Sequence, residues 1–242
     1  GLGDVYKRQD VSGQPHLLAA YGPTLWFMAM MVGVATFSGM SQLHYMETLV
    51  RAATRDALTG VRTRHAGMDE LERLWRLAEA EDRDLGLAFI DLDHFKQIND
   101  TWGHEQGDDA LRALTAHLGR SLRHADLLVR WGGEEFVVVL PDMPASAQRE
   151  FVRRLVRGGF GLRPDGSPIT VSLGLSDRRA DRPRDWEDLV DLADRRMYAA
   201  KQAGRHRAML GDGRMLLLEP AGRGDRQAAM SRRRGGSGKH AA

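Results

Sequence analysis

The sequence predicts an α+β fold of the ferredoxin-like (split βαβ) type, with a central, mainly antiparallel sheet flanked by helices. Three observations predict it. Apolar runs of strand length occur at residues 85–90, 127–131, 136–140 and 169–175. Segments with apolar residues three or four apart separate these runs, as in amphipathic helices. Gly132-Gly133 joins the second run to the third and can supply the positive φ angles of a two-residue hairpin. The resulting order, βαββαβ, is that of the split βαβ plan.

The composition fits one well-cored domain with additional segments. The chain has 242 residues, is 42% hydrophobic and carries a formal net charge of +2. It contains no cysteine, so disulfides and thiolate metal sites are excluded. Residues 211–242 are rich in glycine and arginine, and we expect a disordered basic tail there rather than a nucleic-acid-binding element.

The first nine residues resemble a translated sequencing adapter. Asp4-Val5-Tyr6-Lys7-Arg8-Gln9 is what the DNA string GAT GTG TAT AAG AGA CAG encodes, and that string is similar to a transposon-end adapter. We therefore interpret residues 1–9 as a sequencing remnant, leave them out of the fold argument, and expect the natural chain to begin further upstream.

Residues 10–40 are expected to form a transmembrane segment, the end of a truncated membrane domain. The stretch 17–40 has no charged residue, and a bilayer core needs about 20 apolar residues. The segment fits if Pro23 lies at or near the helix start, where proline is tolerated. Arg51 and Arg55 follow, as in a cytoplasmic exit. A buried helix of a soluble protein is the alternative.

Residues 41–55 are expected to form a signalling helix. Apolar residues recur at alternating spacings of three and four, which is the pattern of a coiled-coil seam. They are Leu43, Met46, Val50, Ala53 and Ala57. A helix that pairs two chains and an amphipathic helix that packs on its own domain both fit this short pattern.

The body, residues 56–210, is predicted to contain four helices. The first carries Met68, Leu71, Leu74, Trp75 and Ala78; the second carries Leu111, Leu114, Leu118 and Leu122, with Asp108 or Asp109 as its cap; the third covers 146–156. Asp185 can cap the last helix and Gly204 can end it. A short strand around 206–210 follows.

Two acids stand where predicted strands end. Asp91 ends the first strand and Glu134 lies in the hairpin. Since a split βαβ sheet can place these strands side by side, both carboxylates can reach one point. Mg²⁺ prefers carboxylate and carbonyl oxygens, usually with substrate phosphates. The sequence therefore predicts a metal and phosphate site.

Further residues can complete such a site. The backbone turn at 92–95 can offer amides to phosphate oxygens, and Lys96 adds a charge. Lys201 and Arg205, one turn apart at the end of the last helix, can grip phosphates or merely complement the helix dipole. We expect a compact turn to bring together Asn99 and Asp108, which can hydrogen-bond a base.

The body resembles the GGDEF family of diguanylate cyclases, in its GGEEF variant. The motifs that carry the resemblance are Asp56-Ala57-Leu58-Thr59-Gly60, Ile90-Asp91-Leu92-Asp93-His94-Phe95-Lys96-Gln97-Ile98-Asn99-Asp100, Gly103-His104-Glu105-Gln106-Gly107-Asp108, Arg130-Trp131-Gly132-Gly133-Glu134-Glu135-Phe136, Val171-Ser172-Leu173-Gly174, and Ala193-Asp194 to Tyr198-Ala199-Ala200-Lys201. The chain departs from the family's usual residues at Thr63-Arg64 and at Gly204-Arg205-His206, which puts local geometry in question.

The resemblance implies that two GTP molecules are condensed into cyclic di-GMP and pyrophosphate by a homodimer. It implies two Mg²⁺ ions per active site, with Mn²⁺ as a substitute. The implied metal ligands are Asp91, the Leu92 carbonyl and Glu134; the implied catalytic residues are Glu134, Glu135 and Lys96; the implied GTP-binding residues are His94, Phe95, Lys96, Asn99, His104, Asp108, Lys201 and Arg205. Arg123 and Asp126 match the family's RxxD inhibitory site for the product; a salt bridge at a helix end is the alternative.

The resemblance also implies a place in the cell and two competing functions. We expect an inner (cytoplasmic) membrane protein, held by its N-terminal segment, with the GGDEF domain in the bacterial cytoplasm and no nucleic-acid partner. One alternative is a non-catalytic module that senses GTP or cyclic di-GMP, although that interpretation predicts a damaged hairpin motif. The other is a related cyclase of mixed purine use, against which Asp108 argues.

Overall fold

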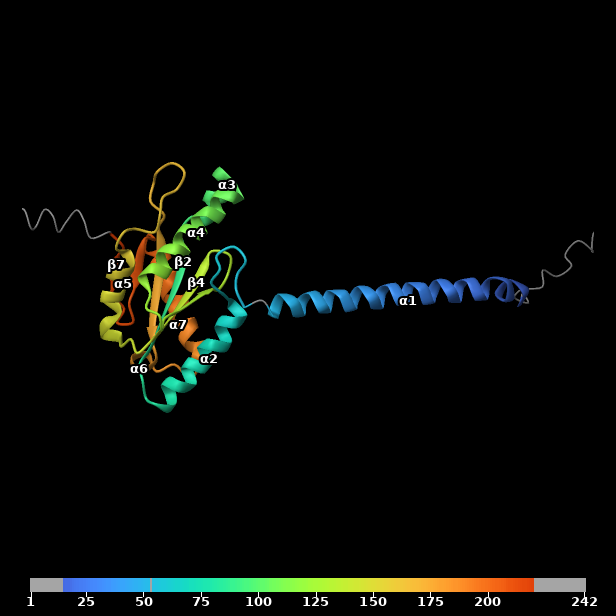
Figure 1. Cartoon of the computed structure of the whole chain (residues 1–242), viewed down its shortest axis with the longest axis horizontal. Helices are drawn as coiled ribbons and strands as arrows, with labels where there is room; N and C mark the ends of the chain where they lie inside the picture. Colours follow the sequence, from blue (N-terminus) through green and yellow to red (C-terminus); the bar gives the residue numbers. More distant parts are fainter. Residues whose placement is uncertain (1–14, 53, 220–242) are drawn as a thin grey trace, which may run out of the picture. The chain divides into compact units, whose positions relative to one another are not determined.

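The structure is a computed structural model that describes residues 15–52 and 54–219 (Figure 1). The chain divides into two units, residues 1–52 and 53–242. The expected adapter remnant and residues 220–242 of the expected tail lie outside the described residues.

The first unit is one helix, α1 (Pro15–Ala52). Its segment Tyr21–Met46 has a mean hydropathy of 1.4 over the most apolar window and is long enough to cross a membrane, a property that signal sequences share. We expected Pro23 at or near the helix start, and this is wrong: Pro23 lies inside α1, which begins at Pro15. Membrane-type helices tolerate such a proline when neighbouring groups use the freed backbone. Thr24 Oγ1 donates to the Tyr21 carbonyl at 2.8 Å, which is not the carbonyl that Pro23 frees, since that one lies four residues before the proline.

The second unit is a mixed sheet with helices on both faces (Figure 1). Its strands are β1 (Arg62–Thr63), β2 (Leu85–Leu92), β3 (Leu127–Arg130), β4 (Glu135–Pro141), β5 (Val171–Asp177), β6 (Arg207–Met209) and β7 (Met215–Leu217). Its helices are α2 (Arg64–Ala80), α3 (Phe95–Trp102), α4 (His104–Ser121), the 3₁₀ turn η1 (Ala145–Ala147), α5 (Gln148–Val156), α6 (Arg178–Asp181) and α7 (Trp186–Gln202).

The strand order confirms the predicted fold class. The sheet runs β1-β3-β4-β2-β5-β6-β7, and within the four central strands β3-β4-β2-β5 each strand is antiparallel to its neighbour. These four strands with α3, α4 and α5 form the split βαβ core. The outer strands β1 and β6 join in parallel, and β7 pairs antiparallel with β6.

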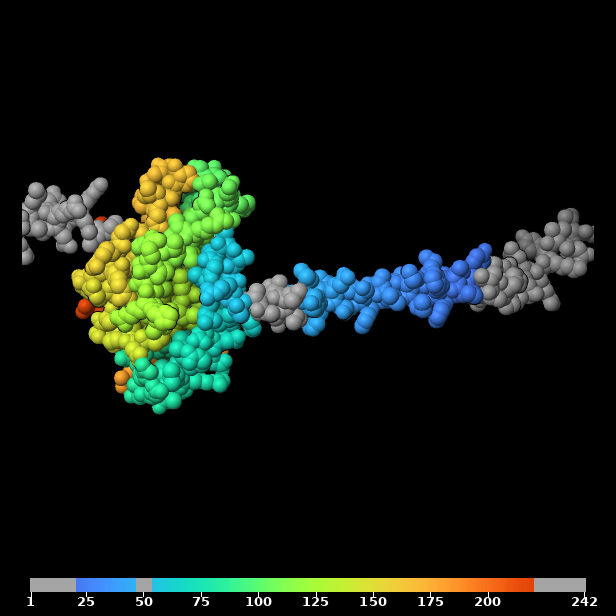
Figure 2. Space-filling model, viewed as in Figure 1, coloured from blue at the N-terminus to red at the C-terminus, as the bar shows by residue number. Residues whose placement is uncertain are grey.

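Alternate side chains of β2 enter two apolar cores, as expected for a strand buried on both faces. Ile90 and Leu92 pack in the core beneath α4 and α5, whereas Leu87 and Phe89 pack in the core beneath α2 and α7. Figure 2 shows the first of these faces from outside, with α4 in green beside α5 in yellow. Asp91 lies in phase with Leu87 and Phe89, on the α7 side.

Two predicted segments differ in the structure. The expected compact turn between Lys96 and Asp108 consists of α3 and the first turn of α4, which meet at Gly103 with φ +86°. Gly103 precedes α4, so Asp108 and Asp109 lie within the helix and do not cap it. Residue 211 is too early a start for the expected tail. The strand β7 follows it and pairs with β6, and Leu218 is fully buried.

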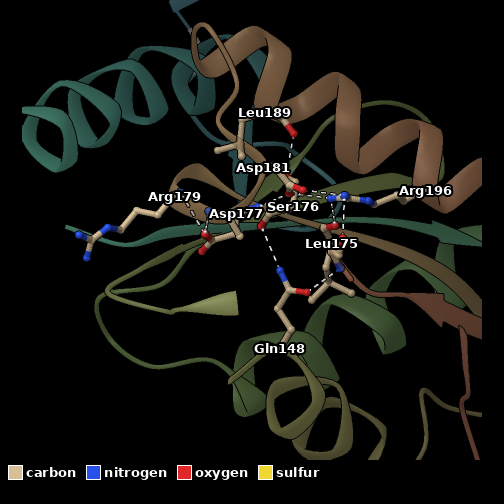
Figure 3. A network of polar contacts seen from close by, with 10 residues as sticks. Gln148, Leu175, Ser176, Asp177, Arg179, Asp181, Leu189 and Arg196 are labelled. Carbon is tan, nitrogen blue, oxygen red and sulfur yellow. Dashed lines mark hydrogen bonds and ion pairs between the residues drawn. The ribbon is translucent and has the colours of Figure 1, made fainter. Parts of the chain in front are cut away.

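A buried polar network fixes α7 on the sheet at the end of β5 that lies away from Asp91 (Figure 3). Arg196 of α7 donates to the Leu175 carbonyl at 2.8 Å and makes two contacts of 2.7 Å with the Asp181 carboxylate. Gln148 of α5 accepts a 2.8 Å hydrogen bond from the Gly211 amide. The network therefore connects β5, the helices α5, α6 and α7, and the loop at Gly211, where Arg196 also donates to the Gly211 carbonyl at 3.0 Å.

Candidate functional site

The backbone brings three acidic residues near one another where β2 and β4 lie side by side. Asp91 stands directly opposite Glu135 in the β2–β4 register. The Leu92 amide donates to the Glu134 carbonyl at 3.2 Å. The backbone thus brings together Asp91 and the Glu134-Glu135 pair, which lie more than 40 positions apart in the sequence.

Asp91 is the buried acid of this cluster, and its carboxylate is paired with Lys201. It is only 2% exposed, and burial raises its pKa to about 6, although the ion pair with Lys201 works in the opposite direction. Lys201 Nζ lies 2.6 Å from Asp91 Oδ2, while Asp91 Oδ1 is buried with no hydrogen-bond partner among the described residues. Burial also raises the pKa of Glu134, opposed by the charge of Lys201 and reinforced by that of Glu135.

These groups fit a hard divalent cation. A buried carboxylate oxygen without a partner, beside a second desolvated carboxylate, is a site where positive charge is favourable. Within residues 15–52 and 54–219 there is no group of three or more His, Cys, Asp or Glu side chains that could enclose a metal ion. The available ligands are two carboxylates and a backbone carbonyl, and Mg²⁺ commonly combines such a partial set with water and phosphate oxygens.

The hairpin that carries Glu134 is longer than predicted. The last paired residues of β3 and β4 are Arg130 and Phe136, and neither Gly132 nor Gly133 has a positive φ angle. A two-residue hairpin is therefore wrong here. At Gly132 the glycine leaves room for a neighbour, since a Cβ would lie 2.3 Å from Glu135 Oε2.

Two arginines outside the acid cluster brace this hairpin, and the sequence reasoning missed both. Arg130 donates to the Gly133 carbonyl at 2.7 Å and pairs with Asp56 at 2.9 Å. Arg64 lies over the Trp131 ring, 4.7 Å from its centre. The Asp56 turn is thereby connected to the loop that presents Glu134.

The predicted phosphate-binding turn has fewer free amides than expected. The Leu92 amide bonds the Glu134 carbonyl, and the Asp93 amide bonds the Thr170 carbonyl at 2.9 Å. The helix α3 begins at Phe95, after His94 with φ +61°, and has no side-chain cap. The first amides of a helix have no intrahelical partner and favour anions. These are the amides next to the exposed Lys96.

We expected Arg205 at the end of the last helix, and this is wrong, because α7 ends at Gln202. It lies in the following loop, where Arg205 has φ +60° and His206 has φ +49°. The family's usual asparagine tolerates such angles best, and histidine is also enriched there. Histidine at position 206, in place of the family's usual asparagine, is therefore compatible with this loop conformation.

The predicted base-binding residues come from two helices that touch. Asn99 lies on α3 and Asp108 on α4. A Cβ at Gly107 would lie 1.9 Å from Asn99 Oδ1, so glycine lets the two helices approach next to Asp108. Asn99 Oδ1 is buried without a partner in the described part of the chain. His104 opens α4 and is exposed.

Arg123 and Asp126 line one surface cavity of about 750 Å³, on which Arg62 and Arg73 also lie. The Asp126 carboxylate accepts a 2.7 Å hydrogen bond from the Arg123 backbone amide. Its contact is therefore with the main chain, and the Arg123 guanidinium is exposed to the cavity. This geometry differs from a simple helix-end salt bridge.

Comparison with known proteins identifies relatives of the domain. Residues 53–207 match the sequence profile described as "Diguanylate cyclase, GGDEF domain", in agreement with the resemblance seen in the motifs. The probable diguanylate cyclase DgcC of Escherichia coli K12 is 38% identical over 160 residues, which cover 64% of this chain and 42% of DgcC. The chain thus spans less than half the length of that relative.

Solved structures agree with this match. The GGDEF domain of DgcB from Caulobacter crescentus, solved in complex with c-di-GMP, is 34% identical with a TM-score of 0.59, covering 64% of this chain and 94% of that one. A longer DgcB structure with a coiled coil and the GGDEF domain is 30% identical with a TM-score of 0.59, covering 75% and 97%.

Proposed function

The chain belongs to the GGDEF family of diguanylate cyclases, and we propose that it condenses two GTP molecules into cyclic di-GMP and pyrophosphate. One observation carries the proposal: the intact segment Gly132-Gly133-Glu134-Glu135-Phe136 lies beside the buried Asp91, whose Oδ1 has no partner among the described residues.

The metal ligands would be Asp91, the Leu92 carbonyl and Glu134. Two Mg²⁺ ions, or Mn²⁺, when bound would neutralise the triphosphate and acidify the attacking hydroxyl. The unpartnered Asp91 oxygen and the raised pKa of both acids support these ligands. Lys201, which pairs with Asp91 here, would exchange that carboxylate for a phosphate oxygen as GTP binds.

The chemical step is an in-line displacement at the α-phosphorus, and it occurs twice, once for each GTP, so that two pyrophosphates leave. Glu134 accepts the proton of the ribose 3′ hydroxyl, the 3′ oxygen forms a bond to the α-phosphorus, and the bond to pyrophosphate breaks. A carboxylate such as that of Glu134 is a group that can accept this proton. Glu135 assists by charge and orientation, and Lys96 stabilises the negative charge on the phosphates. Positioning and charge neutralisation carry most of the rate in such reactions.

The remaining contacts hold the nucleotide. The amides of His94 and Phe95, at the start of α3, and the side chain of Arg205 bind phosphate oxygens. Asn99, His104 and Asp108 surround the base. A carboxylate accepts hydrogen bonds from the N1–H and amino group of guanine, whereas adenine lacks that donor pair. Asp108 therefore favours GTP over ATP.

The reaction needs two protomers, since each domain holds one GTP. We propose that α1 tethers the chain to the inner membrane and that its C-terminal part pairs with a second copy, with the catalytic domain in the cytoplasm. The apolar span Tyr21–Met46 supports the tether, and the DgcB structure with a coiled coil supports the pairing.

Product inhibition is part of the proposal. The exposed Arg123 guanidinium and the Asp126 carboxylate share one cavity of about 750 Å³, where they would bind the guanine edges of cyclic di-GMP. The chain would in this way limit its own output.

The test is product identification. The 242-residue chain, purified in detergent and shown to be dimeric, is incubated with GTP and Mg²⁺, and the nucleotide product is identified by mass spectrometry. We expect cyclic di-GMP, its loss in Glu134→Gln, and normal turnover in Glu79→Gln, a matched change at an exposed acid of α2. GTP binding by a dimer without turnover would favour the sensor function.

A further inference from the structure

Asp93 is a buried acid whose two carboxylate oxygens both accept hydrogen bonds from other parts of the protein. It is 1% exposed. Oδ1 accepts a 2.8 Å hydrogen bond from Ser172 Oγ on β5, and Oδ2 accepts a 2.9 Å hydrogen bond from the His206 backbone amide. Its own amide donates to the Thr170 carbonyl at 2.9 Å. Asp93 therefore joins the turn after β2 to the loop after α7, which is 113 residues away in the sequence.

That loop has a conformation that needs support. Gly204, Arg205 and His206 have φ angles of +114°, +60° and +49°. Side chains other than glycine rarely adopt this region, and such geometry persists where surrounding contacts fix it. The Arg205 amide bonds the Ala200 carbonyl at 3.1 Å, and the next amide bonds Asp93. The backbone of Arg205 is thus fixed on both sides.

The outer side of the loop is held as well. The Leu218 amide donates to the His206 carbonyl at 3.0 Å, and Leu218 is fully buried. His206 therefore lies between an inner carboxylate and an outer strand end. Among the loop residues Gly204, Arg205 and His206, Arg205 alone has a permanently charged side chain, and Arg205 is exposed.

We propose that Asp93 is a positioning residue that aims Arg205 at the triphosphate through the His206 amide. The inference rests on the proposed role of Arg205 as a phosphate ligand. Asp93 follows Asp91, the proposed metal ligand, by two residues. The same turn of the chain would therefore position both the proposed metal ligands and the side chain of Arg205. A preorganised arginine loses less freedom when it binds phosphate.

The chain offers a matched control for a purely structural role. Asp177 is also 1% exposed and also accepts two hydrogen bonds, from the amides of Arg179 at 3.0 Å and Ala180 at 2.7 Å. Asp177 is the last residue of β5 (Figure 3), whereas Ser172, which donates to Asp93, lies near the start of that strand. Asp177→Ala removes an equivalent buried acid without touching the Arg205 loop.

Asp93→Asn is the conservative variant. Its amide oxygen can accept from the His206 amide, and its NH₂ group can donate to Ser172 Oγ, so both contacts survive without the charge. Asp93→Ala removes both. This pair of variants separates the loss of the hydrogen bonds from the loss of the carboxylate.

The experiment uses the 242-residue chain in detergent and measures two quantities. Isothermal titration gives the Kd for α,β-methylene-GTP with Mg²⁺, and hydrogen exchange without nucleotide gives the protection of the segment 203–208. The variants are Asp93→Ala, Asp93→Asn, Asp177→Ala, Arg205→Ala and the Asp93→Ala/Arg205→Ala double variant.

We expect Arg205→Ala to raise the Kd by about tenfold or more, the range for a hydrogen-bonded charge. Asp93→Ala should match it, the double variant should be no weaker than Arg205→Ala, and Asp93→Asn and Asp177→Ala should stay within about threefold of the parent. Only the variants with Asp93→Ala should lose protection of the His206 amide.

Three results would overturn the inference: Kd effects of Asp93→Ala and Arg205→Ala that multiply, an equal loss in Asp177→Ala, or unchanged His206 protection in Asp93→Ala. A parent chain that binds the nucleotide and shows this pattern but forms no cyclic di-GMP would refute the proposed function and leave the positioning role standing. A parent chain that binds no nucleotide would also overturn the inference, because Arg205 would then have no triphosphate at which to be aimed.

Discussion

Gly174 is the point where α7 lies closest to β5, and replacing it with alanine should move the helix. A Cβ at Gly174 would lie 2.0 Å from the Ala193 carbonyl oxygen, 2.2 Å from the Met197 nitrogen and 2.8 Å from the Arg196 carbonyl carbon. All three are backbone atoms, so no side-chain rotation relieves the contact. Reaching the lower limit of ordinary contact, 3.4 Å, from 2.0 Å requires a shift of about 1.4 Å.

The shift would reach the site through Lys201. Its Nζ lies 2.6 Å from Asp91 Oδ2, and a displacement of about 1.4 Å puts this pair near the limit of an ion pair. The polar network of Arg196 resists the movement, so the protein must either break that network or accept strain. We expect Gly174→Ala to cost about 1–3 kcal/mol in free energy of unfolding, the range for overpacking, and to reduce cyclic di-GMP synthesis at least about tenfold.

The assay is thermal unfolding of the domain followed by circular dichroism, together with GTP turnover. A loss of about 1–3 kcal/mol corresponds to a fall in Tm of several degrees for a domain of this size. Gly119→Ala is the control, because Gly119 lies on α4 with nothing within 4 Å of its Cβ position, and alanine there should stabilise by up to about 1 kcal/mol. Equal Tm and turnover in Gly174→Ala and the parent would refute the argument.

Three further predictions concern the same domain. Binding of Mg²⁺ in the presence of the GTP analogue should weaken as the pH falls from 8 to 5, because Asp91, with its pKa raised to about 6, must be ionised to bind a cation; calorimetry that gives one affinity across this range contradicts the assignment. Arg123→Ala should raise the cyclic di-GMP concentration needed for half-inhibition by at least about tenfold and leave the initial rate unchanged, and unaltered inhibition rejects the product site. Arg130→Gln breaks the contacts with Asp56 and the Gly133 carbonyl and should lower kcat by about tenfold through a looser hairpin; an unchanged kcat means that the hairpin does not depend on this arginine.

The sequence predicts most of the sheet, because its central strands are continuous apolar runs. β2 is buried along its whole length and β4 along its interior, and such strands are recognised by composition alone. The acid cluster was also predictable in outline, since Asp91 and Glu134 stand at the ends of these runs. What positions them, the register of β2 with β4, follows from the fold and not from either segment by itself.

The failures have physical causes. The helix α3 is only eight residues long, and Ile98 is its one fully buried residue, so no repeated apolar pattern marks it. Gly132 resembles a turn glycine but has no positive φ angle, and a Cβ there would meet only the end of the Glu135 side chain. The strand β7 has three residues and gains its stability from β6. The role of Asp93 depends on an amide 113 residues away, which no local pattern contains.

The most direct test of the account is where a metal ion binds. A crystal of the domain with Mn²⁺ and α,β-methylene-GTP gives an anomalous signal that locates the ion without reference to any assumed ligand. The account predicts two peaks beside the triphosphate, at least one of them about 2.2 Å from carboxylate oxygens of both Asp91 and Glu134 and from a phosphate oxygen. A nucleotide-bound structure in which the ion is absent from this point, or in which Glu134 faces away from it, would contradict the central claim.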